Sequence, residues 1–545
     1  MLQGNTQKYF VLKNFLQQNQ INISNLELQF RCNLFGSKQI EELGEGLRSS
    51  SNLKQLILNL EENQLTDKGI FRFCIGLENC QNLADLTLFL KYNYICDSGA
   101  TCLGKSLGKL QNLNNLMISL SQNNIKDQGL VTFGSGFKNL NNIQNITLDL
   151  SQNNICDQGI SALSSVIGNF QNLQNLYLNL FMNHISNKGA DEMGKKLRNN
   201  RCLQYMNINL SGNSIGDIGL FGLGQGLAKC PNLKNLYLDL NCNYVGDNRV
   251  KSLGIGLGMS SSLNILQISL VNNKVNQQWI SSFCNELGKS QTISTLKLDL
   301  RQNAFKCQEE ISDFCGGLKN CQNLKIIDFD LRKNQIQTKM ASEMFAGLGG
   351  STSLEKLKLN FRQNSFGDLN EQIEGFGLSF TECVNLRELD IDLHQSQMSS
   401  QVAKSLSYIL SNCNQLEKVS IDLSGCKICS DVVSGLGQCL KNCQNILFLH
   451  LNLEINCIRE EGIIALSDGL AKCSKLKHLI LKLQQNKIDV AVSNYLGLEL
   501  KNCRNIIILQ INLSSQSFWP RRSEQIIMLE LIRKMKKLVI KDIQF

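Results

Sequence analysis

Residues 118–130 read ISLSQNNIKDQGL, and residues 148–160 read LDLSQNNICDQGI. Two nearly identical stretches of thirteen residues therefore lie thirty positions apart in one chain. A catalytic motif is seldom written twice, whereas a structural unit that stacks on a copy of itself recurs at a fixed period. The pair indicates a repeat fold.

The period extends along almost all of the 545 residues. The frame L-x-x-L-x-L-x-L-x-x-N-x-L begins at 17 positions, from Ile23 to Ile506. We divide the chain into an N-terminal cap segment (1–22), an array of about 17 units (23–535) and a C-terminal capping strand (536–545). The units from about residue 290 to 430 are less regular, which fits either repeat drift or a specialised contact region.

Each unit has two halves with different periods. In residues 56–61 leucines alternate with other side chains, which predicts a strand with one buried face. In residues 70–77 apolar side chains are spaced by three and four, which predicts a helix lying on the sheet. The unit is therefore strand, turn and helix, and each strand should pair in parallel with the next.

Two polar columns accompany this pattern. An acidic or amide residue precedes each helical half, and we expect its side chain to accept hydrogen bonds from the free N–H groups of its own helix start. This column comprises Asp67, Asp97, Asp127, Asp157, Asn187, Asp217 and Asp247. An asparagine follows each strand, and we expect a buried amide ladder that bonds to backbone groups where the chain bends. The ladder should fail at Ser396, Cys426 and Gln516, where other residues stand in the column.

The repeated frame resembles that of the leucine-rich repeat family, and its helical halves resemble the ribonuclease-inhibitor-like class. The resemblance implies an α/β solenoid with parallel strands on a concave face and helices on a convex face. Strands stack about 4.8 Å apart and helices need about 9 Å, so the solenoid should curve into a horseshoe. One departure is an additional alternating pair before the asparagine, which should lengthen each strand.

Composition limits the possible partners and compartments. The net charge of +9 is modest for this length, and we find no aromatic-basic motif typical of nucleic-acid binding. The chain shows neither a signal-peptide pattern nor a run of about 20 apolar residues that would cross a bilayer. We interpret most of the 22 cysteines as buried thiols of a cytoplasmic protein. We therefore expect no nucleic-acid partner and no membrane insertion.

The outward-facing strand positions supply the candidate partner-binding residues. Tyrosines and phenylalanines are suitable aromatic anchors for a protein partner. Aspartates on successive strands could meet a basic patch of a partner, although the nearby arginines favour internal charge pairing. The candidates are Phe89, Tyr177, Phe181, Tyr237, Asp239, Asp299, Arg301, Asp330, Arg332, Arg362, Asp392 and Asp422.

The sequence offers no constellation of nucleophile, base and orienting residue, so we expect no enzyme and no catalytic residue. The CKIC stretch at 426–429 and Cys443 would lie at opposite ends of a unit, so we expect no metal or cofactor. The glycine-rich stretch GLGQGL at 222–227 indicates close helix packing rather than a phosphate loop. We predict a scaffold or adaptor that binds a protein on its concave face. The resemblance leaves a regulator of a small GTPase, a kinase-associated repeat part, and cytoskeletal or ciliary partners as alternatives.

Overall fold

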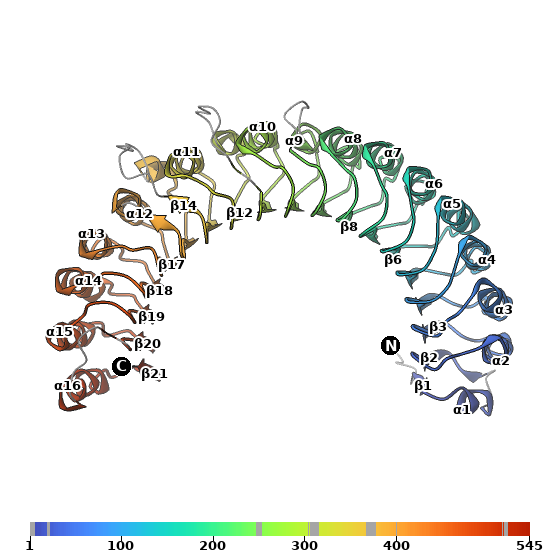
Figure 1. Cartoon of the computed structure of the whole chain (residues 1–545), viewed down its shortest axis with the longest axis horizontal. Helices are drawn as coiled ribbons and strands as arrows, with labels where there is room; N and C mark the ends of the chain where they lie inside the picture. Colours follow the sequence, from blue (N-terminus) through green and yellow to red (C-terminus); the bar gives the residue numbers. More distant parts are fainter. Residues whose placement is uncertain are drawn as a thin grey trace. The chain divides into compact units, whose positions relative to one another are not determined.

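A computed structural model describes residues 6–18, 22–246, 253–303, 305, 315–366, 378–398, 400–514, 516 and 522–544. The chain divides into two compact units, Met1–Asn273 and Lys274–Phe545. In both units a strand, a turn and a helical segment recur in the order that the sequence predicts (Figure 1). The predicted residue Asp247 and much of the extra length of the irregular units lie outside the described residues.

Unit 1 alternates short strands with helices. Its strands are β1 (Gln7–Tyr9), β2 (Asn25–Gln29), β3 (Gln55–Asn59), β4 (Asp85–Phe89), β5 (Asn115–Ser119), β6 (Asn145–Asp149), β7 (Asn175–Asn179), β8 (Tyr205–Asn209), β9 (Asn235–Asp239) and β10 (Ile265–Ser269). Its helices are α1 (Leu12–Leu16), α2 (Ser37–Arg48), α3 (Asp67–Leu77), α4 (Asp97–Leu107), α5 (Asp127–Gly136), α6 (Asp157–Gly168), α7 (Asn187–Leu197), α8 (Asp217–Leu227) and α9 (Leu253–Gly258).

Unit 2 has the same alternation with more variation in its helical layer. Its strands are β11 (Thr295–Asp299), β12 (Ile326–Asp330), β13 (Lys356–Asn360), β14 (Ser365–Phe366), β15 (Glu388–Asp392), β16 (Gln397–Met398), β17 (Lys418–Asp422), β18 (Phe448–Asn452), β19 (His478–Lys482), β20 (Ile508–Asn512) and β21 (Ile540–Gln544). Its α-helices are α10 (Gln277–Leu287), α11 (Thr338–Gly349), α12 (Ser400–Asn412), α13 (Ser430–Leu440), α14 (Glu460–Lys472), α15 (Val490–Leu500) and α16 (Arg522–Arg533), and its 3₁₀ turns are η2 (Gly316–Asn320) and η3 (Leu378–Glu382).

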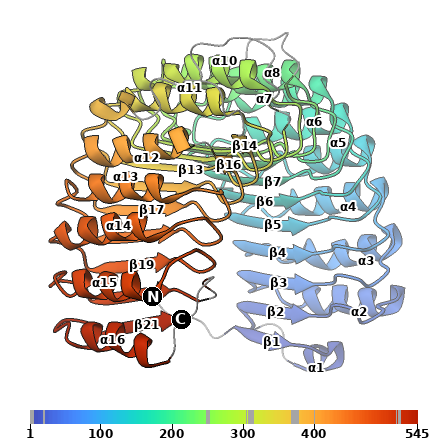
Figure 2. The same ribbon diagram turned by 60° about the vertical axis from the view of Figure 1, so that its left-hand side comes forward.

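The five-residue strands pair in parallel and in one repeating register. Leu56 of β3 lies opposite Leu86 of β4, and Leu86 lies opposite Leu116 of β5. These leucines are buried against the helices, while the residues between them face outward. Within each unit the strands line the inner side of a curve and the helices its outer side (Figures 1 and 2). The predicted concave strand face and convex helical face are confirmed.

The asparagine column forms the predicted buried ladder. Asn213 Nδ2 donates to the carbonyls of Leu180 and Leu210 at 3.0 and 2.9 Å, and its Oδ1 accepts from Ile185 N at 2.9 Å. One amide therefore bonds to the backbone of its own repeat and of the preceding one. This arrangement explains the preference for asparagine, because the side chain supplies both donors and an acceptor.

The expected breaks in the ladder are filled by other side chains. Ser396 Oγ donates to Phe361 O at 2.9 Å, and Cys426 Sγ donates to Leu393 O at 2.9 Å. Gln516 Nε2 donates to Leu483 O at 2.8 Å, and its Oε1 accepts from Asn486 N at 3.2 Å. The prediction of failure is wrong, because a hydroxyl, a thiol or a longer amide reaches the same backbone carbonyl.

The acidic column has a different role from the predicted helix cap. Asp67 is the first residue of α3, and its Oδ1 accepts from Cys96 N of the next repeat at 2.7 Å. Asp127 accepts from Cys156 N in the same way at 2.7 Å. Helix α3 has no side-chain cap bond from its preceding residue, Thr66. These carboxylates therefore link successive repeats, while their place in the first helical turn also suits the helix dipole.

The glycine of the repeated D-x-G sequence makes this link possible. A Cβ atom at Gly129 would lie 2.4 Å from Asp97 Oδ1 of the preceding repeat. The glycine-rich helices show the same close approach, since a Cβ atom at Gly226 would lie 2.1 Å from Gly194 O. The interpretation of GLGQGL as a helix-packing segment is confirmed.

A second amide ladder, which the sequence analysis missed, lies at the opposite end of the strands. Asn112 Nδ2 donates to Gln81 O at 2.9 Å, and Asn505 Nδ2 donates to Ser474 O at 2.7 Å. A cysteine column lies beside this second amide ladder, and in it Cys80 Sγ donates to Leu47 O at 3.4 Å. Burial raises the pKa of the Cys80 thiol to about 12. The predicted burial of this column is confirmed for Cys80, Cys230, Cys383, Cys413, Cys443, Cys473 and Cys503.

Candidate functional site

The last residue of many inner-face strands is an aspartate or asparagine with a local backbone role. Asp239 Oδ1 accepts from Asn241 N at 3.0 Å, and Asp422 Oδ1 accepts from Ser424 N at 2.9 Å. Such a bond closes a turn two residues along the chain, which is a common use of these short side chains. The column of carboxylates that we assign to partner binding therefore also terminates the strands.

Three tyrosines form one aromatic cluster on the inner face of unit 1. Tyr177 of β7 and Tyr237 of β9 occupy the same strand position, with Asn207 of β8 between them in register. Tyr205, at the start of β8, places its ring between the other two, with centroid distances of 4.8 Å to Tyr177 and 5.2 Å to Tyr237. We call these three residues the tyrosine cluster. Sequence reasoning missed Tyr205 because it stands two residues earlier on its strand.

The tyrosine cluster is partly accessible, and the pKa values of two of its members are raised. Hydrogen bonding with Tyr205 raises the pKa of Tyr177 to about 12, and burial raises the pKa of Tyr237. The Tyr177 side chain remains 41% exposed. A row of aromatic rings with hydroxyl groups can bury apolar area and also hydrogen-bond to a partner.

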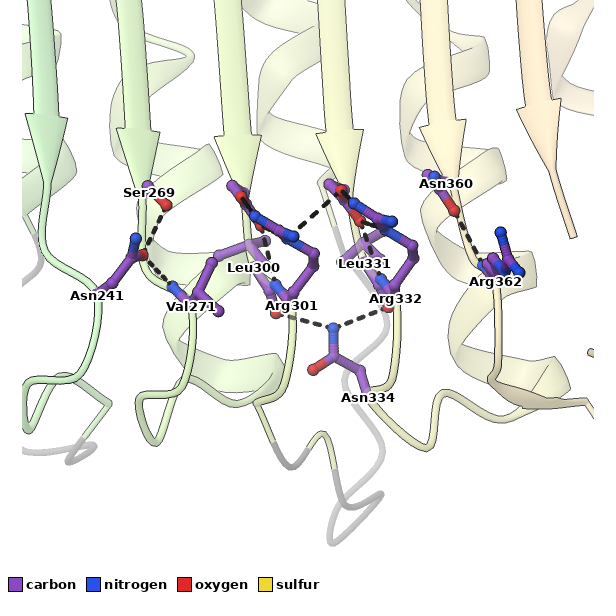
Figure 3. A network of polar contacts seen from close by, with 12 residues as sticks. Asn241, Ser269, Val271, Leu300, Arg301, Leu331, Arg332, Asn334, Asn360 and Arg362 are labelled. Carbon is purple, nitrogen blue, oxygen red and sulfur yellow. Dashed lines mark hydrogen bonds and ion pairs between the residues drawn. The ribbon is translucent and has the colours of Figure 1, made fainter. Parts of the chain in front are cut away.

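The other candidate residues of unit 1 do not join this cluster. Phe89 ends β4, three strands before β7, so it lies about 14 Å away along the sheet. Phe181 follows β7 and is half-buried, four residues beyond Tyr177 on the same strand path. Asn241, beyond Asp239, is held by the Ser269 hydroxyl and by Val271 N, both at 2.6 Å (Figure 3).

In unit 2 the predicted aspartates and arginines alternate along the ends of successive strands. Arg301 binds Asp299 through Nε at 2.7 Å and Nη2 at 2.5 Å, and its Nε also lies 3.6 Å from Asp330. Arg332 binds Asp330 through Nε at 2.9 Å and Nη2 at 2.6 Å (Figure 3). Internal charge pairing therefore satisfies these four residues and fixes the two guanidinium planes.

Arg362 differs from the other two arginines. Residue 360 is asparagine, whose Oδ1 accepts from Arg362 N at 3.1 Å, and Arg362 makes no ion pair within the described residues. The three arginines, with Gln302, Lys333 and Gln363, line a shallow cavity of about 380 Å³ that we call the arginine pocket. The three guanidinium groups and the Lys333 ammonium carry four positive charges, whereas the paired carboxylates of Asp299 and Asp330 carry two negative charges. The excess of positive charge means that the pocket favours an anion.

Asp392 and Asp422 lie opposite each other on β15 and β17 without an arginine between them. Asp392 accepts from His394 N at 3.0 Å, and His394 Nδ1 contacts Ser424 Oγ at 2.5 Å. Burial, and then the Asp422 charge, raise the pKa of Asp392. The pair forms a polar network next to the arginine pocket, and the charge of Arg362 partly offsets the rise in the pKa of Asp392.

These groups lie on the strand faces of the two units. Within the described ranges, no group of three or more His, Cys, Asp or Glu side chains could hold a metal ion. In that same part of the chain, we identify no helix with both the length and the apolarity needed to cross a membrane.

Comparison with known proteins gives one family match and a set of similar solved structures. The family described as Leucine Rich repeat matches residues 142–164, which run from the start of β6 into α6. The fold is a leucine-rich repeat solenoid. No curated protein matches the sequence. The solved structures similar to the chain include the crystal structure of PEPR1-AtPEP1, with 16% sequence identity, coverage of 93% of this chain and 74% of that chain, and a TM-score of 0.33.

The leucine-rich repeat architecture supports protein binding in general. Its parallel strands present outward-facing side chains at regular spacing, so the solenoid offers an extended surface to a large ligand. Several large side chains converge on these inner faces at the tyrosine cluster and at the arginine pocket.

Proposed function

We propose that this protein is a scaffold or adaptor that binds a protein partner on its inner strand face. The tyrosine cluster is the observation that carries the proposal. Tyrosines are enriched among the residues that dominate binding energy, because a rigid ring buries a large area at low entropic cost. Phe89, Phe181 and Asp239 extend this surface along unit 1, and the arginine pocket, Asp392 and Asp422 form the contact surface of unit 2.

We infer further that the solenoid is of the ribonuclease-inhibitor-like class and acts in the cytoplasm. Full α-helices, such as the 11 residues of α3 and the 12 of α6, support the class. The compartment is supported by the described cysteines, which are free thiols, as expected in a reducing environment.

The experiment compares capture of partners by two matched variants. The first replaces Tyr177, Tyr205 and Tyr237 by alanine, and the second replaces Phe71 and Ile75 on α3, which are 50% and 41% exposed on the helical side. We expect the first variant to bind a partner captured by the wild type with at least 30-fold lower affinity. This factor corresponds to the loss of about 2 kcal/mol of binding free energy for one anchor residue. The second variant should retain the partner.

The opposite pattern would refute the proposal. A partner that survives the tyrosine substitutions and is lost with the α3 variant would place the binding surface on the helices. Urea unfolding of both variants establishes that each remains folded.

Regulation of a small GTPase is a second candidate, favoured by the position of Arg362. This arginine lies just beyond a strand and makes no ion pair within the described part of the chain, so it could reach a nucleotide phosphate in a bound GTPase. GTP hydrolysis by a panel of small GTPases, with wild type and Arg362→Ala, tests it. Unchanged hydrolysis with the wild-type chain would eliminate this candidate.

A further inference from the structure

A second basic cavity, separate from the inner-face surface, lies where two helices of unit 2 turn back into strands. The turn between α15 and β20 contributes Lys501 and Arg504, and the turn between α16 and β21 contributes Lys534, Lys536 and Lys537. These five cations line a cavity of about 690 Å³ that we call the lysine pocket. A volume of this size is typical of small-molecule sites.

Within the described residues, no ion pair compensates the charge of the lysine pocket. Some cations at equivalent turns elsewhere bind a glutamate of a neighbouring repeat, as Lys325 binds Glu355 at 2.8 Å, whereas Lys475 bonds to Asn445 Oδ1 at 2.7 Å. Arg387 likewise binds Glu417 at 3.1 Å. Among the described residues, none of the five cations of the lysine pocket forms an ion pair. Five cations gathered around one cavity repel one another, so this arrangement is electrostatically unfavourable without a bound anion. Exposed cations that only solvate the ends of helices would not need to gather in this way.

The backbone beneath the cavity is fixed by bonds between neighbouring turns. Val539 N donates to Ile507 O at 2.8 Å, and Asn505 Nδ2 donates to Ser474 O at 2.7 Å. The Lys537 ammonium donates to Asn505 Oδ1 at 2.7 Å, which directs that side chain along the pocket wall. The turns therefore fix the backbone that carries the cations, and the bond to Asn505 orients Lys537, which lowers part of the cost of binding.

We propose that the lysine pocket binds a compact anion that carries several phosphate groups. Lysine ammonium groups bind phosphate oxygens as point charges, and an arginine can add a bidentate contact. One phosphate carries about two negative charges, so several phosphates are needed to balance five cations. Among the described residues, no aromatic side chain lines the cavity, which disfavours a single-stranded nucleic acid, because such strands stack their bases on aromatic side chains.

Inositol hexakisphosphate serves as the soluble probe in a titration calorimetry experiment with the full chain. The test variant is Lys534→Gln with Lys536→Gln and Lys537→Gln. The control, Lys68→Gln with Lys188→Gln and Lys427→Gln, makes the same change in net charge at exposed lysines elsewhere. We expect the test variant to lose affinity at least 100-fold, since three charge-assisted bonds are removed, and the control to lose less than about 3-fold.

Two further arms distinguish the source of the phosphates. Vesicles with 5% of a bisphosphorylated inositol lipid test a membrane headgroup, and tripolyphosphate tests a second free solute. Pocket-dependent binding of either class supports the proposal and identifies the source. Equal losses in the test and control variants, or an absence of binding to all three probes, would overturn it.

A single-stranded oligonucleotide that binds more tightly than every phosphate probe, and depends on the same lysines, would also overturn the proposal. This inference does not depend on the proposed protein-binding function, because the lysine pocket and the tyrosine cluster share no residue. Urea unfolding of the test variant confirms that the surface substitutions leave the fold intact.

Discussion

The two units use the same repeat but differ in their polar ladder and inner face. In unit 1 an unbroken asparagine series runs from Asn63 to Asn273, and the inner face at β7–β9 carries the tyrosine cluster. In unit 2 the ladder position is occupied by serine at 396, cysteine at 426 and glutamine at 516, and the inner face carries ion pairs. The fold therefore tolerates other residues at the ladder position and on the inner face, as long as the buried backbone groups keep hydrogen-bond partners.

The difference shows which chemical property of the ladder the fold requires. An asparagine contacts two carbonyls and one N–H group, whereas Ser396 donates to one carbonyl and accepts one weak bond of 3.3 Å from Asn364 N. The regular unit should therefore depend more on each single ladder residue than the irregular unit does. The predictions below test this asymmetry.

The largest effect is expected for Asn213→Leu in unit 1. The substitution keeps a similar volume but leaves Ile185 N without its acceptor, at about 1–3 kcal/mol for a buried group. It also removes one of two amide donors from the carbonyls of Leu180 and Leu210, which still accept from Asn183 and Asn243. We expect the free energy of unfolding to fall by roughly 2–4 kcal/mol, with faster hydrogen exchange in the flanking repeats. Urea unfolding and exchange mass spectrometry measure both changes.

The matched control is Asn154→Leu, since Asn154 is exposed and bonds chiefly to the Asn124 side chain. Surface changes of this kind are usually within about 0.5 kcal/mol. Similar losses in the free energy of unfolding for Asn213→Leu and Asn154→Leu would show that a buried ladder position contributes no more to stability than an exposed one.

Ser396→Ala in unit 2 should have a smaller effect. The substitution removes the hydroxyl that bonds to Phe361 O, so one strong and one weak bond are lost. We expect a loss of about 1–2 kcal/mol by urea unfolding, with Ser474→Ala at an exposed position as the control. A loss equal to that of Asn213→Leu would remove the distinction between the two ladders.

Much of this fold is predictable because it depends on period alone. The strands, the buried leucines and the Asn213 amide follow from alternation within one repeat and from its copy thirty residues later. The role of Asp67 could not be predicted, because its partner N–H belongs to the next repeat and local sequence suggests a helix cap. Sequence reasoning places Tyr177 and Tyr237 on one face but misses Tyr205, whose ring direction is set by packing.

Asp392→Asn tests the network on β15 and β17 through its dependence on pH. Burial raises the pKa of Asp392 in the folded state above its unfolded value, so the folded protein binds this proton more tightly. The stabilising contribution of the group is complete below the unfolded pKa and is lost as the pH rises through the folded pKa. At pH 7 we therefore expect Asp392→Asn to be the more stable protein, since the amide oxygen can still accept from His394 N.

The measurement is urea unfolding between pH 3 and pH 8. The advantage of Asp392→Asn should decline as the pH falls and disappear once the wild-type carboxyl is protonated in both states. Asp542→Asn, at an exposed site on β21, should show no such trend. A constant difference between wild type and Asp392→Asn at every pH would attribute the change to packing rather than to charge.

The smallest effect is expected for Arg332→Gln, which removes one ion pair from the inner face of unit 2. The Arg332 and Asp330 side chains are 34% and 22% exposed, so solvent and salt weaken their attraction. We expect a loss of about 0.5–1 kcal/mol at low ionic strength that shrinks toward zero in 0.5 M salt. Tyr237→Phe on the neutral face of unit 1 serves as the control, because its effect should not vary with salt. A loss of stability from Arg332→Gln that is equally insensitive to salt would show that the arginine acts through packing. The ion pair of Arg332 in unit 2 and the tyrosine cluster of unit 1 would then not differ in the way proposed.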